Sequence, residues 1–314
     1  MRKIIEGDVE LESLHLTELL NLSDVEVRGN FNCNTNYLTN LVGSPHTIGN
    51  DFVCNRTNLT SLEGAPHTVG RDFDCRDNNL TNLLGAPKIV RGGMYCTRNP
   101  LESLKGAPKI VDGSFSCSDC PLTSLDGAPQ TVGGDFWCLD SKLTSLAGGP
   151  KTVNGGFYCS DNNLTSLADA PTAVGGVFFC SGNDLTSLEG APQTVVWGFD
   201  CGDNYLTNLI GSPKTVGGSF DCGDNDLTSL DGVPQTIGGI FSCRDNQLTN
   251  FAGGPQTVNA NFYCENNPLT SIEGIPKIIR GNFYISRKLK RKLPEKYIRS
   301  LSEIQGRVVY TLYK

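Results

Sequence analysis

Twelve cysteines recur at an interval of 21 residues, and this interval constrains the fold more than any other feature of the sequence. They are Cys33, Cys54, Cys75, Cys96, Cys117, Cys138, Cys159, Cys180, Cys201, Cys222, Cys243 and Cys264. A fixed period between about 20 and 50 residues is typical of solenoids, in which every repeat forms one coil and stacks on its neighbours. We therefore predict a stack of similar coils, with each repeat position at the same depth in every copy.

The other positions of the repeat are nearly as regular as the cysteine. Leu stands five residues after it, Pro twelve after it and Val or Ile fifteen after it, and Phe stands two before it except where Met94 replaces it. Because Phe-x-Cys has the alternation of a strand, Phe and Cys point inward and the residue between them points outward. Stacked strands of this kind form a parallel sheet of about 13–14 short strands.

The second half of the repeat reads Leu-Thr-Ser-Leu-x-Gly-Ala-Pro-x-Thr-Val-Gly-Gly and is too rich in Gly and Pro for a helix. We expect it to return along the outer side as turns and extended, polyproline-like backbone, so the fold class is mainly β. Three residues after the cysteine, Asn stands in nine of the twelve copies, where it is positioned to hydrogen-bond backbone groups as the strand ends. Cys120 replaces Asn in this row.

The pattern Phe-x-Cys-x-x-Asn-x-Leu-x-x-Leu resembles the leucine-rich repeat, with Phe and Cys in the first two Leu sites. Leu-Thr-Ser-Leu-x-Gly-Ala-Pro resembles the short repeats of bacterial effectors, and the whole unit resembles the 21-residue repeat proteins of tailed bacteriophages, over about residues 7–285. The resemblance implies a leucine-rich-repeat-like solenoid. For function, it implies capture of a host protein, including a component of a defence system, in the host cytoplasm. A structural, virion-associated role is the alternative.

The repeat changes at both ends of the chain. Residues 1–32 are expected to form a divergent capping coil, because Leu11 aligns with the cysteine position but precedes Cys33 by 22 residues. The 21-residue repeats form the solenoid over residues 33–285. Residues 286–314 are expected to form a small α/β cap, in which a helix is followed by a strand. The apolar stripe of that helix is predicted to contain Tyr297, Ile298, Leu301 and Ile304.

Charge separates the cap from the rest of the chain. Residues 286–314 contain nine Lys/Arg and two Asp/Glu, a net charge of +7, whereas the whole chain has −7 and the remainder therefore −14. We interpret the basic segment as a solvated cap or a contact with the acidic repeats rather than a nucleic-acid site. No apolar run approaches about 18 residues, and Met1–Ile5 is too short for a secretory signal, so we expect a cytoplasmic protein without a membrane segment.

The 13 cysteines admit three interpretations: free buried thiols, disulfides and metal binding. Cysteines on neighbouring rungs would lie about 4.8 Å apart, which a disulfide tolerates. A long solenoid needs no covalent staples, and Cys fits where small apolar side chains belong, which favours free thiols. The metal-like spacing Cys-x-x-Cys occurs once, at Cys117 and Cys120, without a histidine beside it. We predict no metal site and no cofactor.

Outward-facing aromatic residues are the candidate binding surface. Trp137, Tyr158 and Phe179 stand at the same position of consecutive copies and are expected to form a stripe about 10 Å long on the concave face. The residues expected to extend this stripe are Tyr95, Leu139, Val177 and Trp197, and the acidic residues expected to flank it are Asp74, Asp200 and Asp221. Exposed aromatic patches are typical of protein-binding sites. Two alternatives are aromatic residues that only cover the sheet and a surface that stacks on sugars or small molecules.

Two further patterns bear on function. Asp stands two residues after the cysteine in seven copies, which fits a turn at the strand exit better than a Ca²⁺ ladder, because each rung supplies few ligands. His46 and His67 occupy the same offset in consecutive copies, so they are repeat residues rather than a catalytic constellation. Every Gly-Gly precedes a strand rather than the helix of a phosphate-binding loop. We expect no catalytic residue and no enzymatic activity.

Overall fold

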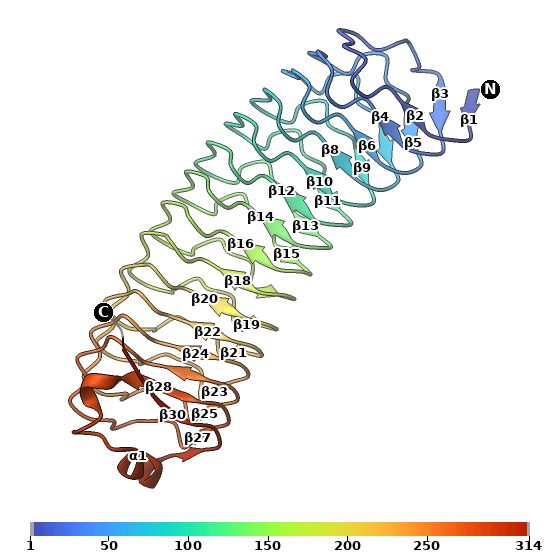
Figure 1. Ribbon diagram of the computed structural model, residues 1–314. Helices are drawn as coiled ribbons and strands as arrows, with labels where there is room; N and C mark the ends of the chain where they lie inside the picture. Colours follow the sequence, from blue (N-terminus) through green and yellow to red (C-terminus); the bar gives the residue numbers. More distant parts are fainter. Residues whose placement is uncertain (1–2, 313–314) are drawn as a thin grey trace. The chain divides into compact units, whose positions relative to one another are not determined.

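The computed structural model describes residues 3–312 and contains two compact units, Met1–Tyr158 and Cys159–Lys314. Within the described residues the units hold fifteen turns, and each turn carries two short strands (Figure 1). The strands that contain the inward Phe form one parallel ladder, the Phe ladder. The strands that end at the Val or Ile fifteen residues after the cysteine form a second parallel ladder, the Val ladder.

The first unit contains eight strands of each ladder. Its Phe ladder comprises β2 (Val9–Glu10), β4 (Phe31–Asn32), β6 (Phe52–Val53), β8 (Phe73–Asp74), β10 (Met94–Tyr95), β12 (Phe115–Ser116), β14 (Phe136–Trp137) and β16 (Phe157–Tyr158). Its Val ladder comprises β1 (Lys3–Ile5), β3 (Val25–Val27), β5 (Thr47–Ile48), β7 (Thr68–Val69), β9 (Ile89–Val90), β11 (Ile110–Val111), β13 (Thr131–Val132) and β15 (Thr152–Val153). Equivalent residues pair in register, as Phe136 does with Phe157.

The second unit contains seven strands of each ladder. Its Phe ladder comprises β18 (Phe178–Phe179), β20 (Phe199–Asp200), β22 (Phe220–Asp221), β24 (Phe241–Ser242), β26 (Phe262–Tyr263), β28 (Phe283–Ser286) and β30 (Val308–Thr311). Its Val ladder comprises β17 (Ala173–Val174), β19 (Thr194–Val195), β21 (Thr215–Val216), β23 (Thr236–Ile237), β25 (Thr257–Val258), β27 (Ile278–Ile279) and β29 (Glu303–Ile304). The mainly β, leucine-rich-repeat-like solenoid predicted from the repeat is therefore confirmed.

The Val ladder is the part of the fold that the sequence interpretation missed. The outer arm was expected to contain only turns and extended backbone, but its Thr-Val end pairs from coil to coil, as in Val132 with Val153. The pairing continues just beyond each strand, where Gly133 N–H donates to the Val111 carbonyl of the preceding coil at 2.9 Å. A constant repeat length brings this segment to the same height in every coil, so strands of only two residues find partners on both sides.

The core is built from the same side chains in every coil. The Phe rings of neighbouring rungs contact one another and most of them stack, for example at a centroid distance of 5.2 Å between Phe31 and Phe52 and 5.1 Å between Phe241 and Phe262. The repeat Cys and the two Leu positions of each arm, the second of which holds Phe251 and Ile272 in the last two copies, are buried beside them. These contacts remove a continuous row of apolar groups from water, which is the main source of stability in a solenoid.

All thirteen cysteines are free and buried. Most thiols of the 21-residue series donate hydrogen bonds to the next coil, as Cys54 Sγ does to the Asp74 carbonyl at 3.3 Å, whereas Cys120 Sγ donates to the Ser118 carbonyl of its own coil at 3.3 Å. Burial raises the pKa of Cys33 to about 12 and that of Cys120 to about 11. The thiols are therefore protonated packing groups rather than nucleophiles.

The Asn row forms the predicted hydrogen-bond ladder. Asn204 Nδ2 donates to the carbonyl of Cys201 in its own coil at 3.2 Å and to that of Cys180 in the preceding coil at 3.1 Å. Its Oδ1 accepts from Leu185 N–H at 3.0 Å. One amide therefore satisfies backbone groups of two coils at the point where the strand ends.

The residue two after each cysteine has a positive φ, for example 55° at Asp77 and 50° at Asp203. Asp and Asn tolerate this left-handed conformation better than most residues, which explains why Asp recurs there. Within residues 3–312, no group of three or more His, Cys, Asp or Glu is placed to hold a metal ion. The same residues contain no helix long and apolar enough to span a membrane.

The C-terminal segment continues both ladders instead of only covering them. After the 3₁₀ helix η1 (Arg287–Leu289) and the helix α1 (Glu295–Leu301), β29 pairs with β27, and β30 pairs with β28 over four residues. Of the apolar stripe expected for the helix, only Ile298 is buried within α1, and Ile304 lies in β29 instead. Tyr297 and Leu301 are 49% and 48% exposed, because a helix of seven residues presents little more than one face to the coil beneath it.

Candidate binding site

The outward residues of the Phe ladder are half-buried at most of the predicted aromatic positions. In the first unit, Trp137 and Tyr158 stand opposite each other on β14 and β16, and their rings stack at 5.7 Å with 24° between the planes. Leu139 follows Trp137 and is also half-buried. Phe179, the third residue of the expected stripe, belongs to the second unit.

The tyrosines of this row fold back onto their own turns. A Cβ atom at Gly93 would lie 2.5 Å from the Tyr95 hydroxyl, and one at Gly156 would lie 2.7 Å from the Tyr158 ring. Each ring therefore occupies the space that a side chain two residues earlier would need. The rings of Tyr95 and Tyr158 thus lie over their own turns, an arrangement that fits aromatic residues covering the sheet.

Five of the predicted residues come together in the second unit. Val177, Phe179, Trp197, Asp200 and Asp221 line an open groove of about 440 Å³, with Gly198 and Ser219 between them. We refer to it as the aromatic-acidic groove. Trp197 is 66% exposed, whereas Phe179 and Val177 are half-buried. A bulky residue at the position where most copies have Gly thus presents its ring to solvent beside a recessed apolar surface.

The two carboxylates of the groove are adjacent rungs of the Phe ladder, since Asp200 on β20 pairs with Asp221 on β22. Each accepts a hydrogen bond from the backbone N–H two residues later, from Gly202 at 2.9 Å and from Gly223 at 2.8 Å. Burial, and less strongly the neighbouring Asp221, raise the pKa of Asp200. Its negative charge is therefore poorly compensated within the protein.

The surrounding sequence reinforces this negative charge. Residues 159–243 contain ten Asp/Glu and a single Lys/Arg, Lys214. The nearest cation that follows, Arg244, lies 3.9 Å from both Asp224 and Asp245. A groove of this composition attracts cationic groups and repels anionic ones.

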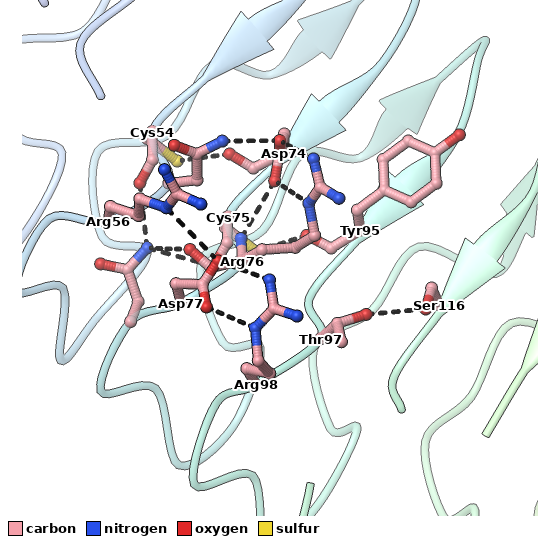
Figure 2. Close-up of polar contacts among 12 residues, drawn as sticks. Cys54, Arg56, Asp74, Cys75, Arg76, Asp77, Tyr95, Thr97, Arg98 and Ser116 are labelled. Atoms are coloured by element: carbon pink, nitrogen blue, oxygen red, sulfur yellow. Dashed lines mark hydrogen bonds and ion pairs between the residues drawn. The ribbon is translucent and has the colours of Figure 1, made fainter. Parts of the chain in front are cut away.

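Asp74 is placed differently from the other two predicted acidic flanks. It is only 7% exposed, and the Arg76 guanidinium binds its carboxylate at 2.7 Å (Figure 2). The Asn55 amide donates to the same carboxylate at 2.8 Å. The same guanidinium lies 5.6 Å from the centre of the Tyr95 ring. The charge of Asp74 is thus neutralised inside the first unit and is not an exposed acidic flank.

A cluster of arginines in the first unit escaped the sequence interpretation. Arg56, Arg76 and Arg98 come from three consecutive coils and surround Asp74 and Asp77 (Figure 2). Arg98 binds Asp77 at 2.9 Å, and this hydrogen bond lowers the pKa of that carboxyl. The sequence did contain an indication of this cluster, because Arg56 and Arg98 replace the Asp or Asn that usually stands two residues after the cysteine.

No protein-family model and no curated protein matches the chain. Among solved structures, YopM from Yersinia enterocolitica WA-314 superposes with a TM-score of 0.55 at 18% identity, over 84% of this chain and 64% of that protein. YopM from Yersinia pestis, a leucine-rich effector protein, superposes with a TM-score of 0.52 at 17% identity, over 96% of this chain and 88% of its own. This chain thus spans less than two thirds of the first protein and most of the second. At such identities the likeness shows the fold, a leucine-rich-repeat-like solenoid.

Proposed function

We propose that this chain is a non-enzymatic protein-binding scaffold whose aromatic-acidic groove captures a basic segment of a partner protein. The observation that carries the proposal is the position of Trp197, which is 66% exposed at the edge of a groove that also contains Asp200 and Asp221. Solenoids with a repeat-determined core bind through the outward residues that vary from coil to coil. The groove gathers such residues from consecutive turns of the second unit.

The chemistry of the groove specifies the partner. Trp is the strongest aromatic partner for a cationic side chain and is enriched among residues that dominate binding energy. Val177 and Phe179 supply an apolar floor, and Asp200 and Asp221 supply acceptors for an ammonium or guanidinium group. The best-fitting ligand is therefore a segment in which Lys or Arg alternates with aliphatic residues.

The resemblance to phage repeat proteins extends this proposal to a host protein, including one of a defence system, bound in the host cytoplasm. A stoichiometric virion component is the competing role. Mass spectrometry of purified virions distinguishes the two: amounts equal to those of coat-associated proteins would favour the structural role, and absence would favour capture of a host protein.

The repeat itself supplies the variant that tests the groove. Val196→Gly combined with Trp197→Gly restores the Gly-Gly that occupies the equivalent positions Gly217 and Gly218 in the next copy. Circular dichroism should be unchanged, while proteins recovered with the wild-type chain in affinity purification should be lost. Tyr205→Ala, which removes an aromatic ring that is 58% exposed elsewhere in the second unit, is the matched control and should retain them.

Binding can also be measured without knowing the partner. The chain has two tryptophans, so Trp137→Phe leaves the emission of Trp197 as the only indole signal. A peptide of alternating Lys and Leu should change this emission saturably and less strongly at high salt. A peptide of alternating Glu and Leu should not. Equal responses to the two peptides, or a response to neutral oligosaccharides alone, would remove the basic-segment proposal.

A further inference from the structure

A second set of departures from the repeat lies on the Val ladder of the first unit. Fourteen residues after the cysteine the repeat has Thr in most copies, but consecutive copies place Ile there at Ile89 and Ile110. Ile89 is 39% exposed and Ile110 is 57% exposed. Two β-branched apolar side chains thus replace hydroxyl groups on a face that is otherwise polar.

These isoleucines border a groove of about 580 Å³ whose lining includes Lys88, Ile89, Ala107, Pro108, Lys109 and Ile110. We refer to it as the basic-aliphatic groove. Strands β9 and β11 hold it together, because Val90 and Val111 pair on the inward side of the same two strands. Pro108 and Ala107 belong to the outer arm and form its apolar wall.

The charge around this groove is opposite to that of the second unit. Residues 86–111 contain five Lys/Arg and a single Asp/Glu, Glu102. Lys88 and Lys109 are exposed, stand directly before the two isoleucines and line the groove, which has Asp112 as its one acidic lining residue. Their long side chains present ammonium groups at the rim while their aliphatic stems extend the apolar surface.

We propose that the basic-aliphatic groove docks an extended acidic segment of a partner protein, in which carboxylates alternate with aliphatic side chains. The aliphatic groups pack on Ile89, Ile110 and the half-buried Ala107, and the carboxylates pair with Lys88 and Lys109. Charge complementarity specifies this occupant, since a basic segment would meet the same ammonium groups with the same sign of charge. The site is distinct from the aromatic-acidic groove in unit, ladder and charge.

The same dipeptide elsewhere in the chain provides a natural control. Lys277 and Ile278 repeat the Lys-Ile pair in the second unit, but Ile278 pairs with Glu303 of the terminal strand β29 and is half-buried. This position differs from the basic-aliphatic groove in two ways. Ile278 has an acidic neighbour, Glu303, and no second Ile stands at the same repeat position in an adjacent coil. Ile278→Thr is therefore a matched control for replacing Ile89 and Ile110 by Thr. The chemical change is the same, but this position should not bind the acidic segment.

The test uses the full chain and two synthetic probes, peptides of alternating Glu and Leu or of alternating Lys and Leu, each with an uncharged fluorophore. The Glu-Leu peptide should bind the wild type, as measured by fluorescence anisotropy. Ile89→Thr with Ile110→Thr should weaken that binding about tenfold or more, and Lys88→Gln with Lys109→Gln by a similar factor that vanishes at high salt. All four replacements are residues that other copies of the repeat carry at these positions, so the fold should be retained.

The controls separate this site from the proposed function. Ile278→Thr and the Val196→Gly/Trp197→Gly variant should bind the Glu-Leu peptide as the wild type does. Wild-type affinity in the Ile89→Thr/Ile110→Thr variant would overturn the proposal. So would loss of Glu-Leu binding in the Trp197 variant, or salt-sensitive dimerisation in sedimentation experiments that the Ile89→Thr/Ile110→Thr change abolishes, since the occupant would then be a second copy.

Discussion

The two grooves differ in almost every property except their origin. The aromatic-acidic groove lies on the Phe ladder of the second unit and combines Trp197 with two carboxylates, whereas the basic-aliphatic groove lies on the Val ladder of the first unit and combines isoleucines with lysines. Both arise where a few positions depart from a repeat that is otherwise constant. A solenoid can therefore vary its surface chemistry from coil to coil without altering the core that carries it.

The interiors of the two units use the same side chains at most rungs of the Phe ladder. Phe136 in the first unit and Phe220 in the second are both fully buried at the same repeat position. Each ring packs between the rings of neighbouring rungs, at 5.3 Å for Phe136 and Phe157 and 5.2 Å for Phe199 and Phe220. Where the rungs carry the same inward residues, the two interiors should respond alike to mutation, and this can be tested.

The largest expected effect is on the core. Phe136→Ala and Phe220→Ala should each lower the free energy of unfolding by about 3–5 kcal/mol, because each leaves a cavity between the aromatic rings of the neighbouring rungs. Urea denaturation followed by circular dichroism measures both. Similar losses would support equivalent interiors, whereas a loss below about 1 kcal/mol in one unit would show that its rung can close over the gap.

A smaller effect is expected from the Asn ladder. Asn99 in the first unit and Asn225 in the second each accept from a Leu N–H in the preceding coil, at 3.0 Å in both cases. Replacement by Ala leaves these buried groups without a partner and should cost about 1–3 kcal/mol in either unit. Asn79→Ala, at an exposed position next to the ladder, should change the urea midpoint little. A neutral result at Asn99 or Asn225 would mean that water replaces the amide.

The smallest expected change in stability comes from Asp200, which lines the aromatic-acidic groove but not the basic-aliphatic groove. Because the pKa of Asp200 is raised in the folded state, its ionisation opposes folding, and stability is lost as the pH rises through that pKa. Asp200→Asn stays neutral and should therefore unfold at a higher urea midpoint than the wild type at pH 7, with the difference disappearing at about pH 3. The variant should also bind the Lys-Leu peptide more weakly and the Glu-Leu peptide unchanged.

Asp203→Asn is the control for this substitution, since Asp203 is exposed and Asn tolerates its left-handed φ of 50° equally well. It should leave both the urea midpoint and its pH dependence near those of the wild type. A lower midpoint for Asp200→Asn at pH 7 would show that the ionised carboxylate stabilises the fold through its bond from Gly202 N–H.

Much of the interior was predictable because the repeat enforces it. The inward Phe and Cys, the buried Leu pairs and the bonding role of the Asn row all follow from position within a 21-residue coil. The sequence did not predict the Val ladder, because Thr-Val followed by Gly-Gly is too short to show the alternation that identifies a strand. Its strands exist because neighbouring coils bring the same two residues into register.

The candidate binding surfaces were predictable only in part. One aromatic and acidic surface was predicted to include Val177, Phe179, Trp197, Asp200 and Asp221, and these residues line the aromatic-acidic groove. The burial of Asp74 by Arg76 and Asn55 could not, because an outward position does not reveal whether a neighbouring side chain neutralises its charge. The sequence also did not predict that the rings of Tyr95 and Tyr158 fold back over Gly93 and Gly156.

By itself, the sequence determined the period, the inward side chains and the class of fold, since identical spacing compels identical depth in every coil. Only the tertiary structure decided which outward side chains are free. Exposure depends on the rotamer of a ring, on a partner from the adjacent coil and on the space that a glycine leaves, and none of these is a property of one repeat. Trp197 projects into solvent and Asp74 is enclosed for that reason.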